Sequence, residues 1–175
     1  NPVHEFGPAL AELIATEWDA GNDHFPPTSF QVSNLHAGTG ADNVIPGHVD
    51  VVFNFRYSPA CTAEGLGART RAVLDRHGLE YELQWRHGAE PFLTEPGPLT
   101  EALSEALEQV VGQRPVMTTT GGTSDARFIA PTGAQVVELG PLNATIHQID
   151  EHIATADLER MATVSEHLLE RLTGV

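Results

Sequence analysis

The sequence has no lysine, so all nine of its basic residues are arginine, set against 24 Asp and Glu. The formal net charge is −15, and no basic cluster interrupts the acidic background. Nucleic-acid-binding proteins neutralise phosphates with Lys and Arg, so this composition argues against a nucleic-acid partner. An anionic substrate would need a local arginine, because the overall field of the protein repels it.

Cysteine and long apolar runs are also scarce. Cys61 is the single cysteine, which excludes an intramolecular disulfide and is typical of a reducing compartment. No apolar run reaches the roughly 20 residues of a membrane-spanning helix, and no signal-peptide pattern is found. We therefore expect a cytoplasmic protein without a membrane partner. The chain opens on Asn1-Pro2 without Met, and we interpret it as a fragment or a processed piece.

The first half of the chain has the hydrophobic spacing of two helices and three strands. Helical spacing occurs at 2–20 and 62–77, and period-two alternation occurs at 28–36, 48–57 and 79–85. This order becomes the βαββαβ ferredoxin-like arrangement if one strand precedes Asn1. We therefore predict a ferredoxin-like domain that lacks its first strand and carries its helices on one face of the sheet.

The spacing of hydrophobic residues changes after Thr94, and Pro96-Gly97-Pro98 indicates a hinge or a domain boundary. The remainder predicts helices and strands in the order αβαβα: 99–111, 116–119, 125–130, 135–139 and a last helix capped by Thr155. The apolar stripe of that last helix predicts a core-facing surface. The chain is thus expected to be of the α/β class, with an α+β domain at 1–93 and part of an α/β domain at 94–175.

Two polar loops, Gly121–Asp125 and Gly140–Thr145, flank the strand expected at 135–139. Loops at strand ends are where α/β proteins usually keep their sites, although two ordinary surface loops remain the alternative. His147 follows the second loop and is a candidate metal ligand, but a lone His is more often structural. Arg56 lies in a strand opposite an apolar face, where it is either a bidentate carboxylate clamp or a solvated or ion-paired arginine.

Five segments carry a recognisable pattern. They are Asn34–Gly47 (N-L-H-A-G-T-G-A-D-N-V-I-P-G), Phe53–Tyr57 (F-N-F-R-Y), Pro91–Thr94 (P-F-L-T), Gly121–Ile129 (G-G-T-S-D-A-R-F-I) and Gly140–His147 (G-P-L-N-A-T-I-H). Together they resemble the succinyl-diaminopimelate desuccinylases, a family of the zinc aminoacylase and carboxypeptidase superfamily. The last two segments are specific to this family, whereas G-T-G-x-x-N-V-I-P is shared with related deacylases.

The resemblance implies a two-domain enzyme with two zinc ions in each active site, for which cobalt is a possible substitute. A ferredoxin-like lid, inserted in the catalytic domain, would form a homodimer. Residues 1–93 would be most of that lid, and 94–175 the end of the catalytic domain. The catalytic base and most metal ligands of the family would lie upstream of Asn1, so no catalytic residue is expected in this chain.

Five residues match functional positions of the family. His147 matches a zinc ligand, and Gly122 and Thr123 match a substrate-binding loop. Arg56 matches the lid arginine that binds a substrate carboxylate. Asn43 matches a lid residue that reaches the active site of the partner subunit.

The implied reaction is hydrolysis of N-succinyl-LL-2,6-diaminopimelate to succinate and LL-2,6-diaminopimelate, in lysine and diaminopimelate biosynthesis. Zinc would lower the pKa of a bridging water and polarise the amide carbonyl. Asp42 stands where the family leads us to expect a small polar residue or Asn, and its charge opposes contact with an anionic substrate. Two alternatives stay open: a sibling deacylase, such as an acetylornithine deacetylase or an aminoacylase, and a non-catalytic dimerisation module.

Overall fold

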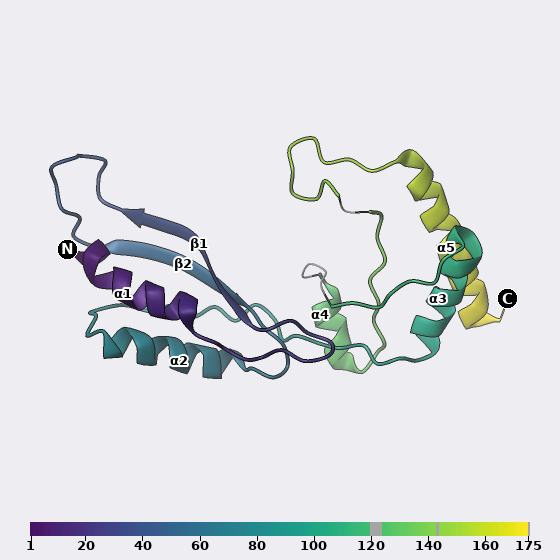
Figure 1. The fold of residues 1–175 in the computed structure, drawn as a ribbon. Helices are drawn as coiled ribbons and strands as arrows, with labels where there is room; N and C mark the ends of the chain where they lie inside the picture. Colours follow the sequence, from purple (N-terminus) through teal and green to yellow (C-terminus); the bar gives the residue numbers. More distant parts are fainter. Residues whose placement is uncertain (120–123, 143, 175) are drawn as a thin grey trace. The chain divides into compact units, whose positions relative to one another are not determined.

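The computed structural model describes residues 1–119, 124–142 and 144–174. The chain divides into two compact units, Asn1–Phe92 (unit 1) and Leu93–Val175 (unit 2) (Figure 1). Unit 1 contains α1 (Pro2–Ala15), β1 (Ser29–Ala37), β2 (Val49–Arg56) and α2 (Ala63–Arg76). Unit 2 contains α3 (Pro98–Val111), α4 (Ala126–Ile129), the 3-10 helix η1 (Ala130–Thr132) and α5 (Thr155–Thr173). The division falls beside the boundary expected from the sequence pattern.

The first helix begins as the sequence predicts and ends earlier than expected. Asn1 is the N-cap and Pro2 the first helical residue, a position where the missing N–H of proline costs nothing. The helix stops before Thr16, whose backbone is extended with φ −67° and ψ 123°, so it does not continue to residue 20. Trp18 lies beyond the helix and still reaches the core, where it is 5% exposed.

An antiparallel pair of strands forms the sheet of unit 1. The register places Ser29 opposite Arg56, and a bulge interrupts it between Val32 and Asn34. Side chains of β2 alternate between half-buried and exposed along its whole length, as the period-two pattern predicts. The inner face carries an aromatic cluster in which the Trp18 and Phe55 ring centroids are 4.6 Å apart. Buried residues of α1 and α2 belong to the same core cluster, so both helices cover one face of the sheet (Figure 1).

The strand expected at 79–85 is absent from the structure. The alternation is kept only in part. Leu79, Leu83 and Trp85 are half-buried, whereas Tyr81, which the period-two pattern places on the same face, is 37% exposed. Trp85 packs on the inner face, with its ring centroid 5.9 Å from that of Phe55. Residues 80–85 nevertheless form no backbone hydrogen bond with any other described residue. A strand requires a neighbouring ladder as well as a buried face, so the complete ferredoxin-like topology stays a prediction.

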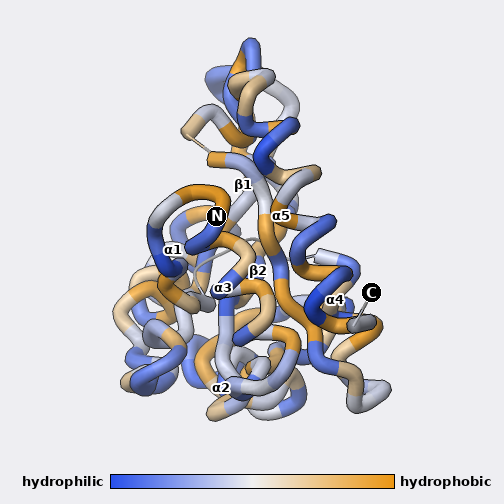
Figure 2. The backbone as a smooth tube through the Cα atoms, turned by 90° about the vertical axis from the view of Figure 1, so that its right-hand side faces the viewer, coloured by the Kyte–Doolittle hydropathy of each residue, from blue (hydrophilic) through white to orange (hydrophobic). Residues whose placement is uncertain are grey.

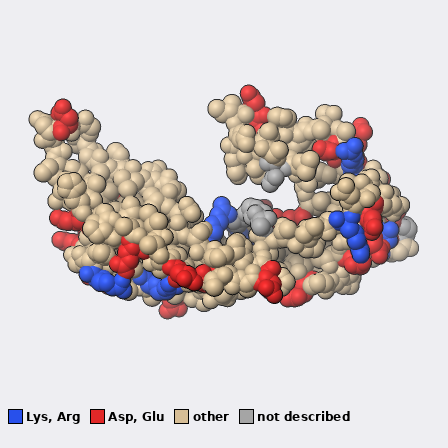
Figure 3. All heavy atoms as spheres, viewed as in Figure 1, with Lys and Arg blue, Asp and Glu red and all other residues tan. Residues whose placement is uncertain are grey.

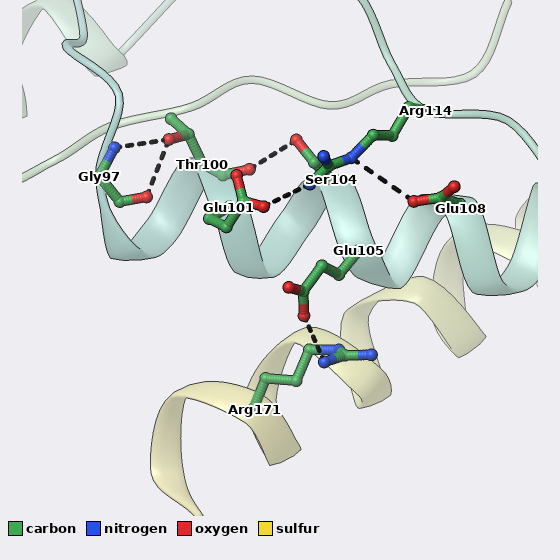
Figure 4. Close-up of polar contacts among 8 residues, drawn as sticks. All are labelled: Gly97, Thr100, Glu101, Ser104, Glu105, Glu108, Arg114 and Arg171. Atoms are coloured by element: carbon green, nitrogen blue, oxygen red, sulfur yellow. Dashed lines mark hydrogen bonds and ion pairs between the residues drawn. The ribbon is translucent and has the colours of Figure 1, made fainter.

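In unit 2 the core lies between α3 and α5, which pack side by side (Figure 1). Leu103 and Ala106 of α3 are buried against Val164 of α5. Apolar and polar residues alternate along the helices (Figure 2). An ion pair between Glu105 and Arg171 also joins the two helices, and Arg114 reaches back to two glutamates of α3 (Figure 4).

Three expectations for unit 2 are wrong. No strand occurs at 116–119 or 135–139, and the described part of this unit contains helices alone. Short apolar runs form strands only beside another strand, and Val116, for example, is 85% exposed. The N-cap of α5 is Ala154, because Thr155 already has helical backbone geometry. The expected stripe of α5 is only partly buried; the residue that is fully buried is Val164, at 1% exposure.

Acidic side chains are spread over the surfaces of both units, whereas arginines are few (Figure 3). Most ion pairs join exposed groups, such as Arg160 with Asp157, and such pairs contribute little to stability. Within the described ranges, no helix is both long and apolar enough to cross a membrane.

Candidate functional site

Arg56 is the last residue of β2 and lies on the face of the sheet opposite α1 and α2. Its side chain is exposed, and it has neither an ion pair nor a hydrogen bond with the described residues. Arg69 is engaged by contrast: it donates to the carbonyl oxygens of Glu17 and Trp18 at 2.8 and 2.5 Å. The guanidinium of Arg56 is therefore free to bind a carboxylate bidentately.

Asn43 lies in an exposed turn of the loop between the strands, next to Asp42. This loop precedes β2, whereas Arg56 ends it. The eight residues of β2 span about 24 Å at the usual rise of an antiparallel strand. One copy of unit 1 therefore does not bring Arg56 and Asn43 to the same small ligand.

The first polar loop of unit 2 is only partly described. Gly122 and Thr123, the expected substrate-binding residues, lie outside the described residues. Ser124 follows them, and its hydroxyl donates to a carboxylate oxygen of Glu138 while accepting from the N–H of Ala126 at 3.0 Å. The hydroxyl thus orders the start of α4, which directly follows the loop.

Arg127 is a candidate that the sequence reasoning missed. It lies on α4 directly after the Gly-Gly-Thr-Ser-Asp run, and its Nε is buried without a hydrogen-bond partner in the described part of the chain. Its guanidinium carbon stacks 4.7 Å above the Phe128 ring. Arg127 as a whole is half-buried, and a buried N–H without a partner is costly, so this arginine is a candidate for binding an anionic ligand. The sequence feature that could have revealed Arg127 is an arginine beside a glycine-rich polar loop in a strongly acidic chain.

His147, two residues after the second polar loop, has an unusual backbone conformation. His147 and Asp150 have φ of 62° each, a left-handed geometry that is uncommon in non-glycine residues and recurs at functional sites. The segment 145–152 is closed by Thr145, whose hydroxyl donates to the carbonyl oxygen of His152 at 2.9 Å. The backbone N–H of His147 donates to the carboxylate of Glu151 at 3.4 Å, and its side chain is exposed.

No group of three His, Cys, Asp or Glu side chains in the described residues is arranged to hold a metal ion. A catalytic zinc site usually takes three protein ligands and leaves one position open. His147 supplies one imidazole, so the described residues do not by themselves form such a site.

Cys61 has the environment of a structural thiol. Its sulfur lies 3.1 Å from a carboxylate oxygen of Asp19, and burial and this carboxylate raise the pKa of the thiol. A raised pKa keeps the sulfur protonated and poorly nucleophilic. Asp19 also accepts hydrogen bonds from Gly21 and Thr28. Burial alone would raise its pKa, but these bonds lower it to about 2.

A sequence model of Peptidase family M20/M25/M40 matches residues 8–171, nearly the whole chain. The chain belongs to Peptidase family M20/M25/M40.

Proteins of similar sequence to this M20 chain include two named succinyl-diaminopimelate desuccinylase. The protein from Thioalkalivibrio sulfidiphilus is 60% identical over 98% of this chain and 46% of its own length. The protein from Methylibium petroleiphilum is 60% identical over 99% of this chain and 45% of its own length. The chain therefore spans less than half the length of these relatives.

A solved structure of similar fold is the M20 family metallo-carboxypeptidase Sso-CP2 from Sulfolobus solfataricus. It superposes with a TM-score of 0.69 at 18% identity, over 82% of this chain and 35% of its own. At this identity the similarity concerns the fold alone. It agrees with the mixed helix and strand content of an α/β family member.

The candidate residues of this M20 chain fall in two separate groups. Arg56 and Asn43 belong to unit 1, at opposite ends of β2. Ser124, Arg127 and His147 belong to unit 2, where no hydrogen bond or ion pair among the described residues joins His147 to the other two. The structure thus identifies available side chains without assembling them around one ligand.

Proposed function

We propose that this chain is part of a divalent-metal-dependent amide hydrolase, a succinyl-diaminopimelate desuccinylase. The reaction is hydrolysis of N-succinyl-LL-2,6-diaminopimelate to succinate and LL-2,6-diaminopimelate, a step of lysine biosynthesis. The observation that carries the proposal is 60% identity over 98% and 99% of the chain to relatives of that name. Because the chain spans less than half of those relatives, the activity is proposed for the longer protein.

In this proposal unit 1 is most of the lid and unit 2 is the end of the catalytic domain. The substrate carries several carboxylates, and an acidic protein needs local cations to hold them. Arg56 supplies such a cation because its guanidinium is exposed and unpaired. Arg127 is a second carboxylate partner, since its Nε is buried without a partner in the described residues. Gly122 and Thr123 are proposed to bind the substrate.

His147 is proposed as one ligand of a site with two zinc ions, in which cobalt can replace zinc. The support is its left-handed backbone on a hydrogen-bonded loop, which holds an exposed imidazole in a defined place. The remaining ligands and the catalytic base belong to the part of the longer protein outside this chain. The metal would act as a Lewis acid on the amide carbonyl.

We further propose a homodimer through unit 1, in which Asn43 acts at the partner's active site. The distance of about 24 Å along β2, from eight residues at the strand rise, supports this, since one copy cannot use Arg56 and Asn43 together. The edge of β1 away from β2 is unpaired among the described residues. A groove of about 420 Å³ lies there, lined by Ile14, Thr16, Trp18 and residues 28–32. The β1 strand of a second copy of the chain can pair with such an unpaired edge.

The test is an assay of the longer protein with zinc, comparing N-succinyl-LL-2,6-diaminopimelate with N-acetylornithine. We expect kcat/KM to favour the succinylated substrate, and His147→Ala to remove both a bound zinc ion and turnover. This 175-residue chain should release no succinate, because one imidazole binds zinc weakly. Preference for N-acetylornithine would favour a sibling deacylase, and a metal-free dimer without turnover would favour a dimerisation module.

A further inference from the structure

His147 lies in a segment whose shape is not fixed by apolar packing. Segment 145–152 directly precedes α5 (Figure 1), and every residue from 146 to 152 is exposed in this chain. Its two isoleucines show this clearly, since Ile146 is 46% and Ile149 is 95% exposed. The first residue, Thr145, is half-buried. Hydrogen bonds must therefore hold this segment in its conformation.

The backbone at His147 needs such support. His147 is the third residue of a turn in which the N–H of Gln148 donates to the carbonyl oxygen of Thr145 at 3.0 Å, and its φ is 62°. A positive φ at this position of a turn favours glycine, because the Cβ of other residues makes left-handed backbone costly. Such a conformation persists only where the surrounding structure over-determines it. The same φ fixes the direction in which the imidazole leaves the backbone.

The Thr145 hydroxyl supplies that support by binding both backbone groups of His152. It donates to the carbonyl oxygen of His152 at 2.9 Å and accepts from the N–H of His152 at 3.1 Å. A hydroxyl can do both at once, because it has one donor and two lone pairs. The β-branched side chain of threonine is also stiff at χ1. The two bonds join positions seven residues apart and close the segment around His147.

Glu151 is the other candidate for this role and makes a weaker contact. Its carboxylate accepts from the N–H of His147 at 3.4 Å, beyond the roughly 3.2 Å at which N–H···O bonds usually end. Its long, exposed side chain also loses more rotamer entropy when it is held in one place. The side-chain amide of Gln148 donates to the carbonyl oxygen of Ala144 at 3.2 Å, which supports the start of the turn but does not close the segment.

We propose that Thr145 is a positioning residue for His147. Its hydroxyl holds segment 145–152 closed, and with it the left-handed backbone that directs the imidazole. The consequence for metal binding rests on the proposed function, in which His147 is a metal ligand. Removing a group that orients a metal ligand typically lowers metal affinity about 10–100-fold, so the Thr145 hydroxyl should matter for zinc without touching it.

Thr145→Val in the longer protein tests the consequence for metal binding, because valine keeps the β-branched shape and lacks the hydroxyl. We expect the affinity for the zinc ion that His147 holds to fall about 10–100-fold, and the visible spectrum of the cobalt-substituted protein to change. Thr145→Ser retains a hydroxyl and should keep the wild-type affinity and spectrum.

Thr163→Val is the matched control. It removes a threonine hydroxyl of α5 that donates to the carbonyl oxygen of Glu159 at 3.1 Å and makes no contact with segment 145–152. Zinc affinity and the cobalt spectrum should stay those of the wild type in this variant.

A second readout follows the backbone and does not require that His147 bind metal. In NMR spectra of this metal-free chain we expect a strong intraresidue HN–Hα NOE at His147, the signature of a positive φ. The amide of His152 should exchange slowly, because it donates to Thr145. Both signals should be lost in Thr145→Val and kept in Thr145→Ser and Thr163→Val.

The two readouts separate failure of this inference from failure of the proposed function. Wild-type zinc affinity in His147→Ala would refute His147 as a ligand, and loss of both backbone signals in Thr145→Val would still support the positioning role. Unchanged backbone signals in Thr145→Val would overturn the inference, as would an equal effect of Thr163→Val. If Thr145→Val does not fold, the wild type decides: a weak NOE at His147 or a rapidly exchanging His152 amide would overturn the inference.

Discussion

Asp19→Asn tests whether one carboxylate organises the connection between α1 and β1. The Asp19 carboxylate accepts from the N–H groups of Gly21 and Thr28 at 2.7 and 3.0 Å, and from the Thr28 hydroxyl. It also accepts from the Cys61 thiol at 3.1 Å. An amide of the same size retains one acceptor oxygen, but its NH₂ group cannot accept from the hydroxyl or the thiol.

The magnitude follows from the pKa. Hydrogen bonding, acting against burial, lowers the pKa of Asp19 from 3.8 to about 2. Each pKa unit corresponds to about 1.4 kcal/mol, so the shift represents about 2 kcal/mol at neutral pH. This is an upper figure, because the group is only partly removed from water. The stabilisation is complete above the unfolded-state pKa and is lost as the pH falls through about 2.

The assay is urea unfolding followed by tryptophan fluorescence. Both tryptophans, Trp18 and Trp85, belong to unit 1, so the signal reports on that unit. At pH 7 we expect Asp19→Asn to lose up to about 2 kcal/mol of unfolding free energy, and the difference from wild type should shrink as the pH is lowered toward 2.

Asp23→Asn is the control, since this exposed carboxylate of the same loop has no hydrogen-bond partner among the described residues. Two results would refute the reasoning. One is an Asp19→Asn variant as stable as wild type at pH 7. The other is a difference from wild type that persists unchanged at low pH.

Two further substitutions test contacts in the two units. Gln135→Ala removes the acceptor for the Leu99 N–H, a cap supplied from elsewhere in the chain, and should cost unit 2 about 1 kcal/mol in helix unfolding followed by circular dichroism. Equal stability would mean that water replaces the cap. Arg56→Lys in the longer protein should lose roughly 1.5–3 kcal/mol in kcat/KM, because lysine cannot form the bidentate contact. Unchanged kinetics would make Arg56 a structural residue.

Features that depend on neighbouring residues could be predicted from the sequence. The Asn1 cap with Pro2 in the first turn is decided within one helical turn, by atoms that are close in any conformation of the chain. The alternation along β2 likewise requires only that one side be apolar and the other polar. The family could also be predicted, because its motifs are contiguous residues that need no fold to be read.

The tertiary structure decided every feature of a segment that depends on which other segment packs or pairs against it. Residues 79–85 keep their alternating burial at every position except Tyr81 without being a strand, since their backbone has no ladder among the described residues to join. Val164 became the most buried residue of α5 because α3 packs on that side of the helix. The separation of Asn43 from Arg56 arises from the length of β2. The hydrogen bond from the Tyr57 hydroxyl to the Glu90 carboxylate joins positions 33 residues apart. Local pattern determines which side of a segment is apolar, whereas pairing and contact partners are set by distant residues whose arrangement exists only in the folded chain.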